Sequence, residues 1–303
     1  MADRVIDVRG LRKSYGDVEA VRGIDIHVDH GEVFALLGPN GAGKTTTVEI
    51  LEGYRSRTDG DASVLGHDPA HQDLALKRRI GIVLQSTGVD PYLTVRETVA
   101  LYAGYYPSPR DVDEVIDLVG LAEKRTTRVN KLSGGQQRRL DVAVALAGDP
   151  ELLFLDEPTT GFDPNARRNA WGIVKNLADI GKTIFLTTHF MDEAQYLADR
   201  VAVIAKGEIV AEGTPATIAG RDRMQTRIRF RLPDGKRPAL ELEDATSLPD
   251  GSWEVRTDNP TKAVHDLTAW ALERGQAYEA LEVTQPSLED VYIELTGGEE
   301  GNE

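Results

Sequence analysis

The stretch Gly38-Pro39-Asn40-Gly41-Ala42-Gly43-Lys44-Thr45-Thr46 decides the fold of this chain. It fits the pattern G-x-x-x-x-G-K-[ST], which binds phosphate groups when a strand precedes it and a helix follows it. The apolar run from Val33 to Leu37 has the length and composition of a strand, and residues 46–52 are suited to open a helix. We therefore predict a strand, a phosphate-binding loop and a helix, in this order.

Each residue type in the loop suits contact with an anion. Gly38, Gly41 and Gly43 let the backbone approach phosphate, because a Cβ there would clash or forbid the dihedral angles. Backbone N–H groups and the helix N-terminus then face the phosphates. Lys44 is placed to reach the β- and γ-phosphates, and Thr45 to offer its hydroxyl to Mg²⁺. The alternative, a glycine-rich turn with an unrelated lysine, is disfavoured because motif and context agree.

Composition excludes several other classes of protein. The 303 residues are enough for one large domain or two smaller ones, and 40% hydrophobic and 28% charged residues fit a soluble globular protein. The formal net charge of -15 disfavours nucleic-acid binding through phosphate neutralisation. The sequence has no cysteine, so disulfides, thiolate catalysis and Cys-ligated zinc are excluded.

The sequence also predicts how the chain relates to a membrane. Residues 1–5 lack the apolar core of a signal peptide, and no apolar run approaches the ~18 residues of a membrane span. We therefore expect the chain not to cross a bilayer by itself and to carry no covalent membrane anchor.

Polar side chains follow three apolar runs that we predict to be strands. Gln85 follows Ile80–Leu84, the pair Asp156 and Glu157 follows residues 151–155, and His189 follows residues 183–188. The carboxyl ends of strands are where α/β proteins place ligand contacts. Asp156 suits a Mg²⁺ shell, and Glu157 is suited to polarise an attacking water. Gln85 either completes the Mg²⁺ shell or is an ordinary residue at a strand end, and His189 either contacts the γ-phosphate or is structural.

Three other segments allow more than one interpretation of their role. Tyr15 either stacks on an adenine ring or closes a small sheet. Ser133-Gly134-Gly135-Gln136 precedes a helix predicted over Gln137 to Ala147 and forms an anion-ready helix N-terminus or a simple cap. His67, Asp68 and His71 suggest a metal site, but Pro69 and the loop composition favour a solvated turn.

Composition changes near residues 213–223, where we predict a domain boundary. Beyond it, alternating and helical apolar patterns predict strands near Arg227–Leu232, Leu240 and Trp253–Arg256, and helices over Thr261–Arg274 and after Pro286. We expect a cassette over residues 1–219, a small α+β accessory domain over 220–298 and a disordered acidic tail over 299–303.

These motifs in this order resemble the ATP-binding cassette of an ABC transporter over residues 5–213. The specific element is Leu132-Ser133-Gly134-Gly135-Gln136, because other P-loop families lack this LSGGQ signature. The resemblance implies an α/β P-loop NTPase fold with a RecA-like core, an antiparallel β subdomain and a helical subdomain. The family pattern has leucine where Phe162 stands, which puts no catalytic group in doubt.

The resemblance also implies a role for each site residue. Tyr15 would stack on adenine, residues 38–46 would bind ATP as Walker A, and Gln85 would be the Q-loop glutamine. Asp156 would be the Walker B aspartate, Glu157 the catalytic glutamate and His189 the switch histidine. The cofactors would be ATP and Mg²⁺, with Thr45, Gln85 and Asp156 around the metal. Across a head-to-tail homodimer, the partner's ATP would meet Ser133, Gly134, Gly135, Gln136 and the D-loop residue Asp163.

The segment from Pro286 to Gly297 resembles the C-terminal motif of drug-resistance-type exporter ATPases, including the daunorubicin-resistance group. Within the ABC family, the chain is therefore most similar to these exporters. Such proteins pair with a separate ABC-2 type membrane subunit, which implies a peripheral location at the cytoplasmic face of the membrane. An ordinary packing helix is the alternative for this segment. Two other functions are alternatives. The first is a soluble ABC ATPase that acts on the ribosome or DNA, which the single cassette and the acidic net charge disfavour. The second is a non-hydrolysing ATP-binding regulator, which the presence of Glu157 and His189 disfavours.

Overall fold

The computed structural model describes residues 4–83, 88–233 and 245–296. The chain divides into two compact units, Met1–Pro215 and Ala216–Glu303, and each is described by itself. The predicted boundary at 219/220 is close to this division. The predicted strand near Leu240, the tail at 299–303 and the candidate residue Gln85 fall outside the described residues.

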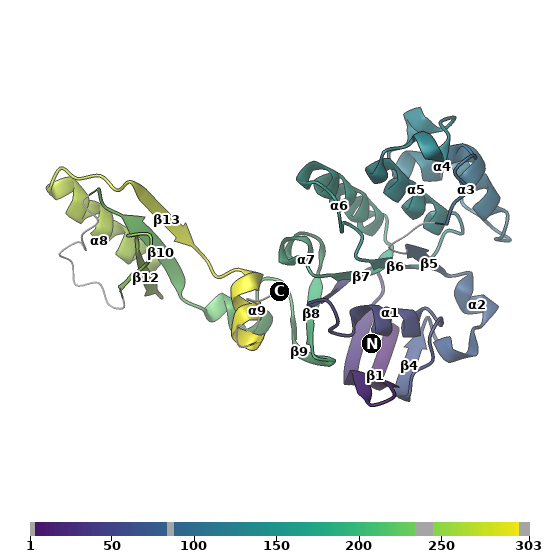
Figure 1. Cartoon of the computed structure of the whole chain (residues 1–303), viewed down its shortest axis with the longest axis horizontal. Helices are drawn as coiled ribbons and strands as arrows, with labels where there is room; N and C mark the ends of the chain where they lie inside the picture. The colour runs from purple at the N-terminus through teal and green to yellow at the C-terminus, as the bar shows by residue number, and fades with distance from the viewer. Residues whose placement is uncertain (1–3, 84–87, 234–244, 297–303) are drawn as a thin grey trace. The chain divides into compact units, whose positions relative to one another are not determined.

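A six-stranded sheet forms the centre of the first unit (Figure 1). Its order is β5-β6-β7-β3-β8-β9, with parallel pairs up to β8 and an antiparallel β8–β9 hairpin. The parallel strands are nearly continuous apolar runs, as a sheet covered on both faces requires. The strands are β3 (Val33–Leu37), β5 (Ile80–Val83), β6 (Leu152–Asp156), β7 (Thr183–Thr188), β8 (Arg200–Ala205) and β9 (Glu208–Gly213).

A second, antiparallel sheet of order β2-β1-β4 contains β1 (Arg4–Tyr15), β2 (Val18–Asp29) and β4 (Asp59–Val64). Helix α1 (Lys44–Leu51) contacts strands of both sheets and contributes to one shared hydrophobic core. Helices α6 (Pro164–Asp179) and α7 (Met191–Leu197) lie on the other side of the six-stranded sheet (Figure 1). The phosphate-binding loop therefore joins a fully buried strand to a helix fixed between two sheets.

The remaining helices of this unit form a separate group. Helices α3 (Val95–Ala103), α4 (Val112–Leu118) and α5 (Gly134–Leu146) pack on one another, and α5 also contacts β5 (Figure 1). The short α2 (Leu74–Lys77) precedes β5. Single 3₁₀ turns cover Pro69–His71, Ala122–Lys124 and Val129–Lys131. Helix α5 begins three residues before the predicted Gln137, because Ser133 caps it and both glycines are helical.

The second unit is a small α+β domain. Its antiparallel sheet has the order β11-β12-β10-β13, and α8 (Pro260–Glu273) packs on it around Ile228, Phe230, Val255 and Leu267. The strands are β10 (Thr226–Arg231), β11 (Thr246–Ser247), β12 (Trp253–Thr257) and β13 (Ala280–Thr284). Helix α9 (Leu288–Thr296) comes after β13 and contacts the 3₁₀ segment Ile218–Arg223, which precedes β10. No helix of the described residues is long and apolar enough to span a bilayer.

Candidate nucleotide-binding and hydrolysis site

Strand register brings three motifs to one edge of the six-stranded sheet. β7 lies between β6 and β3, and all three run parallel. Asp156 at the end of β6 is level with Thr187, and Leu37 at the end of β3 is level with Thr188. The loops that follow these strands therefore start side by side, which is where an open α/β sheet binds its ligands.

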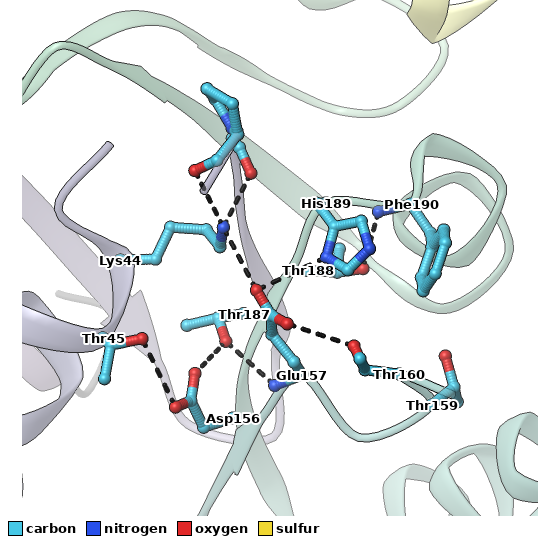
Figure 2. A network of polar contacts seen from close by, with 12 residues as sticks. Lys44, Thr45, Asp156, Glu157, Thr159, Thr160, Thr187, Thr188, His189 and Phe190 are labelled. Carbon is cyan, nitrogen blue, oxygen red and sulfur yellow. Dashed lines mark hydrogen bonds and ion pairs between the residues drawn. The ribbon is translucent and has the colours of Figure 1, made fainter. Parts of the chain in front are cut away.

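The phosphate-binding loop is shaped by close backbone contacts that only glycine allows. A Cβ on Gly38 would lie 2.3 Å from the carbonyl oxygen of Ile204, and one on Gly43 would lie 2.5 Å from that of Ala20. Gly43 also has φ of 107°, in the left-handed region that favours glycine. Lys44 Nζ folds back over the loop and donates to the carbonyl oxygens of Gly38 (2.7 Å) and Pro39 (3.0 Å) (Figure 2).

Lys44 also contacts the predicted catalytic glutamate. Lys44 Nζ lies 3.3 Å from Glu157 Oε1, and His189 Nδ1 lies 3.4 Å from the same oxygen (Figure 2). Thr160 Oγ1 donates to Glu157 Oε2 at 3.1 Å. Burial acts to raise the pKa of Glu157, but Lys44, Thr160 and His189 outweigh burial and lower it. The carboxylate is thus held ionised, as a group that polarises water must be.

Asp156 has a different environment although it is the adjacent residue. Its Oδ1 accepts a 2.5 Å hydrogen bond from Thr187 Oγ1, and its Oδ2 lies 3.5 Å from Thr45 Oγ1 (Figure 2). Burial is the main cause that raises the pKa of Asp156, and the charge of Glu157 adds to it. A bound cation would relieve this cost, because a buried carboxylate is stabilised by a nearby positive charge.

The oxygen atoms of Thr45 and Asp156 fit Mg²⁺. They are hard oxygen donors that face each other, and Mg²⁺ is usually held by one or two carboxylates together with substrate phosphates and water. Within the described ranges, no group of three or more His, Cys, Asp or Glu residues is arranged to hold a metal. Thr45 and Asp156 are two ligands, so phosphate oxygens and water would supply the rest of a Mg²⁺ shell here.

The LSGGQ segment and Asp163 form two capped helix N-termini. Ser133 and Gln136 make a reciprocal capping box at α5, and Asp163 Oδ1 accepts from the N–H groups of Asn165 and Ala166 at α6. Both N-termini, together with Glu157, line a cavity of about 1060 Å³. Among the described residues, no hydrogen bond or ion pair joins Ser133–Gln136 to the phosphate-binding loop.

Tyr15 ends strand β1 and is 41% exposed. The Lys13 ammonium lies 5.1 Å and the Arg55 guanidinium 5.3 Å from the centre of its ring. Tyr15 therefore belongs to the antiparallel sheet, and its partly exposed ring lies beside two cationic side chains. Stacking on adenine stays a prediction, as do the roles of Gln85, which lies outside the described residues, and of the other site residues.

Two residues of this network are not among those predicted from the sequence. Thr187 donates to Asp156 and accepts from the backbone N–H of Glu157 at 3.0 Å. Its signal was a pair of threonines that ends an apolar strand. Arg138, the second residue after the LSGGQ segment, donates to the backbone carbonyls of Asp156 and Pro158. Arg138 is one of two adjacent arginines in this helix, and its residue type gave no sequence signal for such contacts.

A parallel sheet whose phosphate-binding loop meets a pair of carboxylates and a histidine defines a P-loop nucleotide-binding protein. Residues 21–160 match the ABC transporter family, and residues 226–287 match the C-terminal domain of ABC transporter domain-containing protein-like proteins. The chain is 38% identical to the daunorubicin/doxorubicin resistance ATP-binding protein DrrA of Streptomyces peucetius, covering 97% of this chain and 93% of DrrA. It is 39% identical to the Nod factor export ATP-binding protein I of Rhizobium leguminosarum bv. viciae, covering 97% and 95%.

Solved structures agree with this assignment. CbiO1 of Clostridium perfringens, part of an ABC transporter complex, superposes with a TM-score of 0.63 at 28% identity, covering 71% of this chain and 90% of CbiO1. A dimeric ATP-binding cassette in a post-hydrolysis state with ADP and Pi gives a TM-score of 0.61 at 26% identity, covering 69% and 98%. The chain belongs to the ATP-binding proteins of ABC transporters and is an ABC ATPase, which confirms the predicted family, fold class and enzyme class.

Proposed function

We propose that this protein is the ATP-hydrolysing subunit of an exporter and works as a head-to-tail homodimer bound to a separate ABC-2 type membrane subunit. The observation that carries the hydrolytic part is the convergence of Lys44 and His189 on Glu157 Oε1. One carboxylate oxygen thus meets the phosphate-binding lysine and the switch histidine, where the γ-phosphate of ATP and its attacking water would lie.

In this proposal each group has one task. Lys44 and the loop N–H groups bind the phosphates, Glu157 orients and polarises the water, and His189 contacts the γ-phosphate. Thr45 and Asp156 would hold Mg²⁺, which when bound neutralises charge on the phosphate oxygens. Gln85 would complete the same shell. The residue roles rest on the family pattern and on the distances between these side chains.

Dimerisation is proposed from the second anion-ready surface. Ser133–Gln136 and Asp163 line the cavity beside Glu157 but have no hydrogen bond to this chain's phosphate-binding loop within the described part. A second copy could bring its own ATP to them, so that two MgATP lie between two chains. A dimeric cassette structure with 26% identity supports this arrangement.

The export role is proposed from the relatives. One is named for daunorubicin and doxorubicin resistance and another for Nod factor export. We propose drug, lipid or other small-molecule efflux, with the protein placed peripherally at the cytoplasmic face of the membrane through its permease. Affinity isolation of the tagged chain from detergent-solubilised host membranes tests this. A stoichiometric polytopic membrane protein is expected, whereas co-purification with ribosomal proteins alone would reject it.

The hydrolytic role is tested by Glu157→Gln. We expect this variant to bind MgATP, to lose hydrolysis and to accumulate as a dimer, measured by phosphate release and by light scattering after size-exclusion chromatography. Glu151→Gln is the matched control, because Glu151 directly precedes β6 at its other end and pairs with Arg79. A Glu157→Gln protein that stays monomeric at saturating MgATP and hydrolyses it normally would refute the role.

A further inference from the structure

The backbone at Glu157 has an unusual conformation. Glu157 has φ of 44°, in the left-handed region that side chains other than glycine rarely adopt. Such a conformation persists only where the surrounding structure fixes it, and it is common where a side chain must be aimed for function. The groups that fix this peptide therefore control where the Glu157 carboxylate points.

Two elements hold this peptide from opposite sides. The N–H of Glu157 donates to Thr187 of β7, to Oγ1 at 3.0 Å and to the carbonyl oxygen at 3.2 Å. On the other side, Arg138 Nη2 donates to the carbonyl oxygen of Asp156 and Arg138 Nε to that of Pro158, both at 3.2 Å. One guanidinium thus binds the carbonyls of the residues immediately before and after Glu157.

Arg138 is suited to this task by its chemistry and its location. Its side chain is only 10% exposed, and Nη1 lies 3.8 Å from the buried Asp141 Oδ2. A guanidinium presents five donors in a rigid plane, so it is able to bridge two carbonyls that a lysine ammonium could not bind with the same geometry. Burial lowers the pKa of Arg138, and the charges of Asp141, Asp156 and Glu193 act against this.

Arg138 also connects this peptide to the LSGGQ helix. Helix α5 runs over Gly134–Leu146, so Arg138 is its fifth residue and lies at the start of the second turn after the Ser133 cap. A displacement of α5 moves the guanidinium, and with it the carbonyls that flank Glu157. We propose that Arg138 is a positioning residue that transmits the position of the LSGGQ helix to the catalytic carboxylate of the same chain, an inference that rests on the proposed role of Glu157.

A second contact steadies the same turn from α7. Glu193 Oε1 accepts from Thr159 Oγ1 at 2.8 Å and from Trp171 Nε1 at 3.0 Å, and all three side chains are buried. This contact holds Thr159, two residues after Glu157, through hydrogen bonds that do not involve the Arg138 side chain, although the charge of Glu193 acts on the Arg138 pKa. We therefore expect this contact to keep the turn folded when Arg138 is changed. The loss of Arg138 should then alter the direction of the Glu157 carboxylate more than the stability of the turn.

The test compares Arg138→Gln and Arg138→Lys with wild type in the full chain, using steady-state ATP hydrolysis, nucleotide affinity and thermal unfolding. We expect Arg138→Gln to lower kcat about tenfold or more with KM for ATP nearly unchanged, because small misplacements of a catalytic group cost up to ~100-fold. The kcat of Arg138→Lys should lie between those of Arg138→Gln and the wild type. Wild-type kcat per folded molecule in both variants would overturn the inference. If Arg138→Gln does not fold, the kcat of Arg138→Lys alone decides.

Two further variants separate positioning from a loss of stability. Arg57→Gln is the matched control, because Arg57 is also partly buried and donates to a backbone carbonyl, that of Gly60, away from the site. It should lower the melting temperature and leave kcat unchanged. In a Glu157→Gln background, adding Arg138→Gln should cause no further loss of residual hydrolysis. A further tenfold loss there would show that Arg138 acts independently of Glu157 and would overturn the inference.

The same set of variants separates a failure of this inference from a failure of the proposed function. If Glu157→Gln hydrolyses ATP at the wild-type rate, the proposed role of Glu157 fails and the inference fails with it. If Glu157→Gln is inactive while both Arg138 variants keep wild-type kcat, only the inference fails.

Discussion

Lys44 Nζ lies 3.3 Å from Glu157 Oε1, and both side chains are less than a tenth exposed. The two residues are 113 positions apart in the sequence: Lys44 begins α1 after the loop that follows β3, and Glu157 directly follows β6. Each is the other's buried counter-charge, which offsets the cost of taking both from water. The γ-phosphate of ATP would compete with Glu157 for Lys44, so nucleotide binding would free the carboxylate to contact water.

Lys44→Ala should weaken ATP binding by about 10–100-fold, because a charge-assisted hydrogen bond to phosphate contributes about 1.5–3 kcal/mol. The measurement is equilibrium titration with a fluorescent ATP analogue. Lys77→Ala is the control, since Lys77 ends the short helix α2 and is exposed. Equal affinity in Lys44→Ala and wild type would contradict the assignment of the phosphate-binding loop.

Ser133→Ala and Thr94→Ala remove the same local interaction from two helices. Ser133 and Thr94 each form a capping box, with Gln136 on α5 and with Glu97 on α3. Each substitution should lower the free energy of unfolding by about 1 kcal/mol. Only Ser133→Ala should also lower ATP hydrolysis and ATP-dependent dimer formation, because only that helix N-terminus is proposed to meet the partner's ATP. Equal hydrolysis in the two variants would leave Ser133 with a capping role alone.

The fold was predictable where local signals agree with tertiary packing. Strand β3 has the predicted bounds, and the phosphate-binding loop lies between a buried strand and a helix as expected. The start of α5 was predicted too late, because two glycines disfavour a helix locally while the Ser133–Gln136 capping box stabilises it. Asp156, Glu157 and His189 were predicted as site residues from the sequence, because each is a polar residue at the end of a recognisable apolar strand.

The contacts within the site were less predictable. Thr187 and Arg138 act through backbone atoms of residues 156–158, and such contacts depend on strand register and on how α5 packs. The left-handed conformation of Glu157 has no signal in residue type, because glutamate is not favoured there. Its cause is tertiary: β7 on one side and α5 on the other.

Gly43→Ala and Gly172→Ala should change stability in opposite directions. A Cβ at Gly43 would meet the carbonyl oxygen of Ala20 at 2.5 Å in a backbone conformation that alanine disfavours, so we expect a loss of about 2 kcal/mol or more. Gly172 lies within α6 with open space around the added Cβ, so alanine there should gain about 0.5–1 kcal/mol. Urea unfolding measures both. A neutral Gly43→Ala would show that the loop can relax.

Glu52 makes the stability of the protein dependent on pH. Its side chain is 4% exposed, and Oε1 has no hydrogen-bond partner within the described part of the chain. Burial, and then the charges of Asp156 and Glu49, raise its pKa from 4.5 to about 8. Below pH 4.5 the carboxyl is protonated in the folded and unfolded states. Between pH 4.5 and 8 the unfolded chain releases this proton while the folded chain keeps it, so the contribution to stability falls as pH rises through this window.

Glu52→Gln should abolish this part of the pH dependence, because the amide stays neutral at every pH. At pH 7 the variant should be more stable than wild type by about 2–3 kcal/mol, and at pH 4.5 the two should converge. Urea unfolding from pH 4.5 to 8.5, without nucleotide or divalent cations, gives the two curves. Glu208→Gln, at an exposed residue of β9, controls for the loss of one acidic group. Parallel curves for Glu52→Gln and wild type would mean that Glu52 is ionised in the folded protein, with its charge stabilised despite burial.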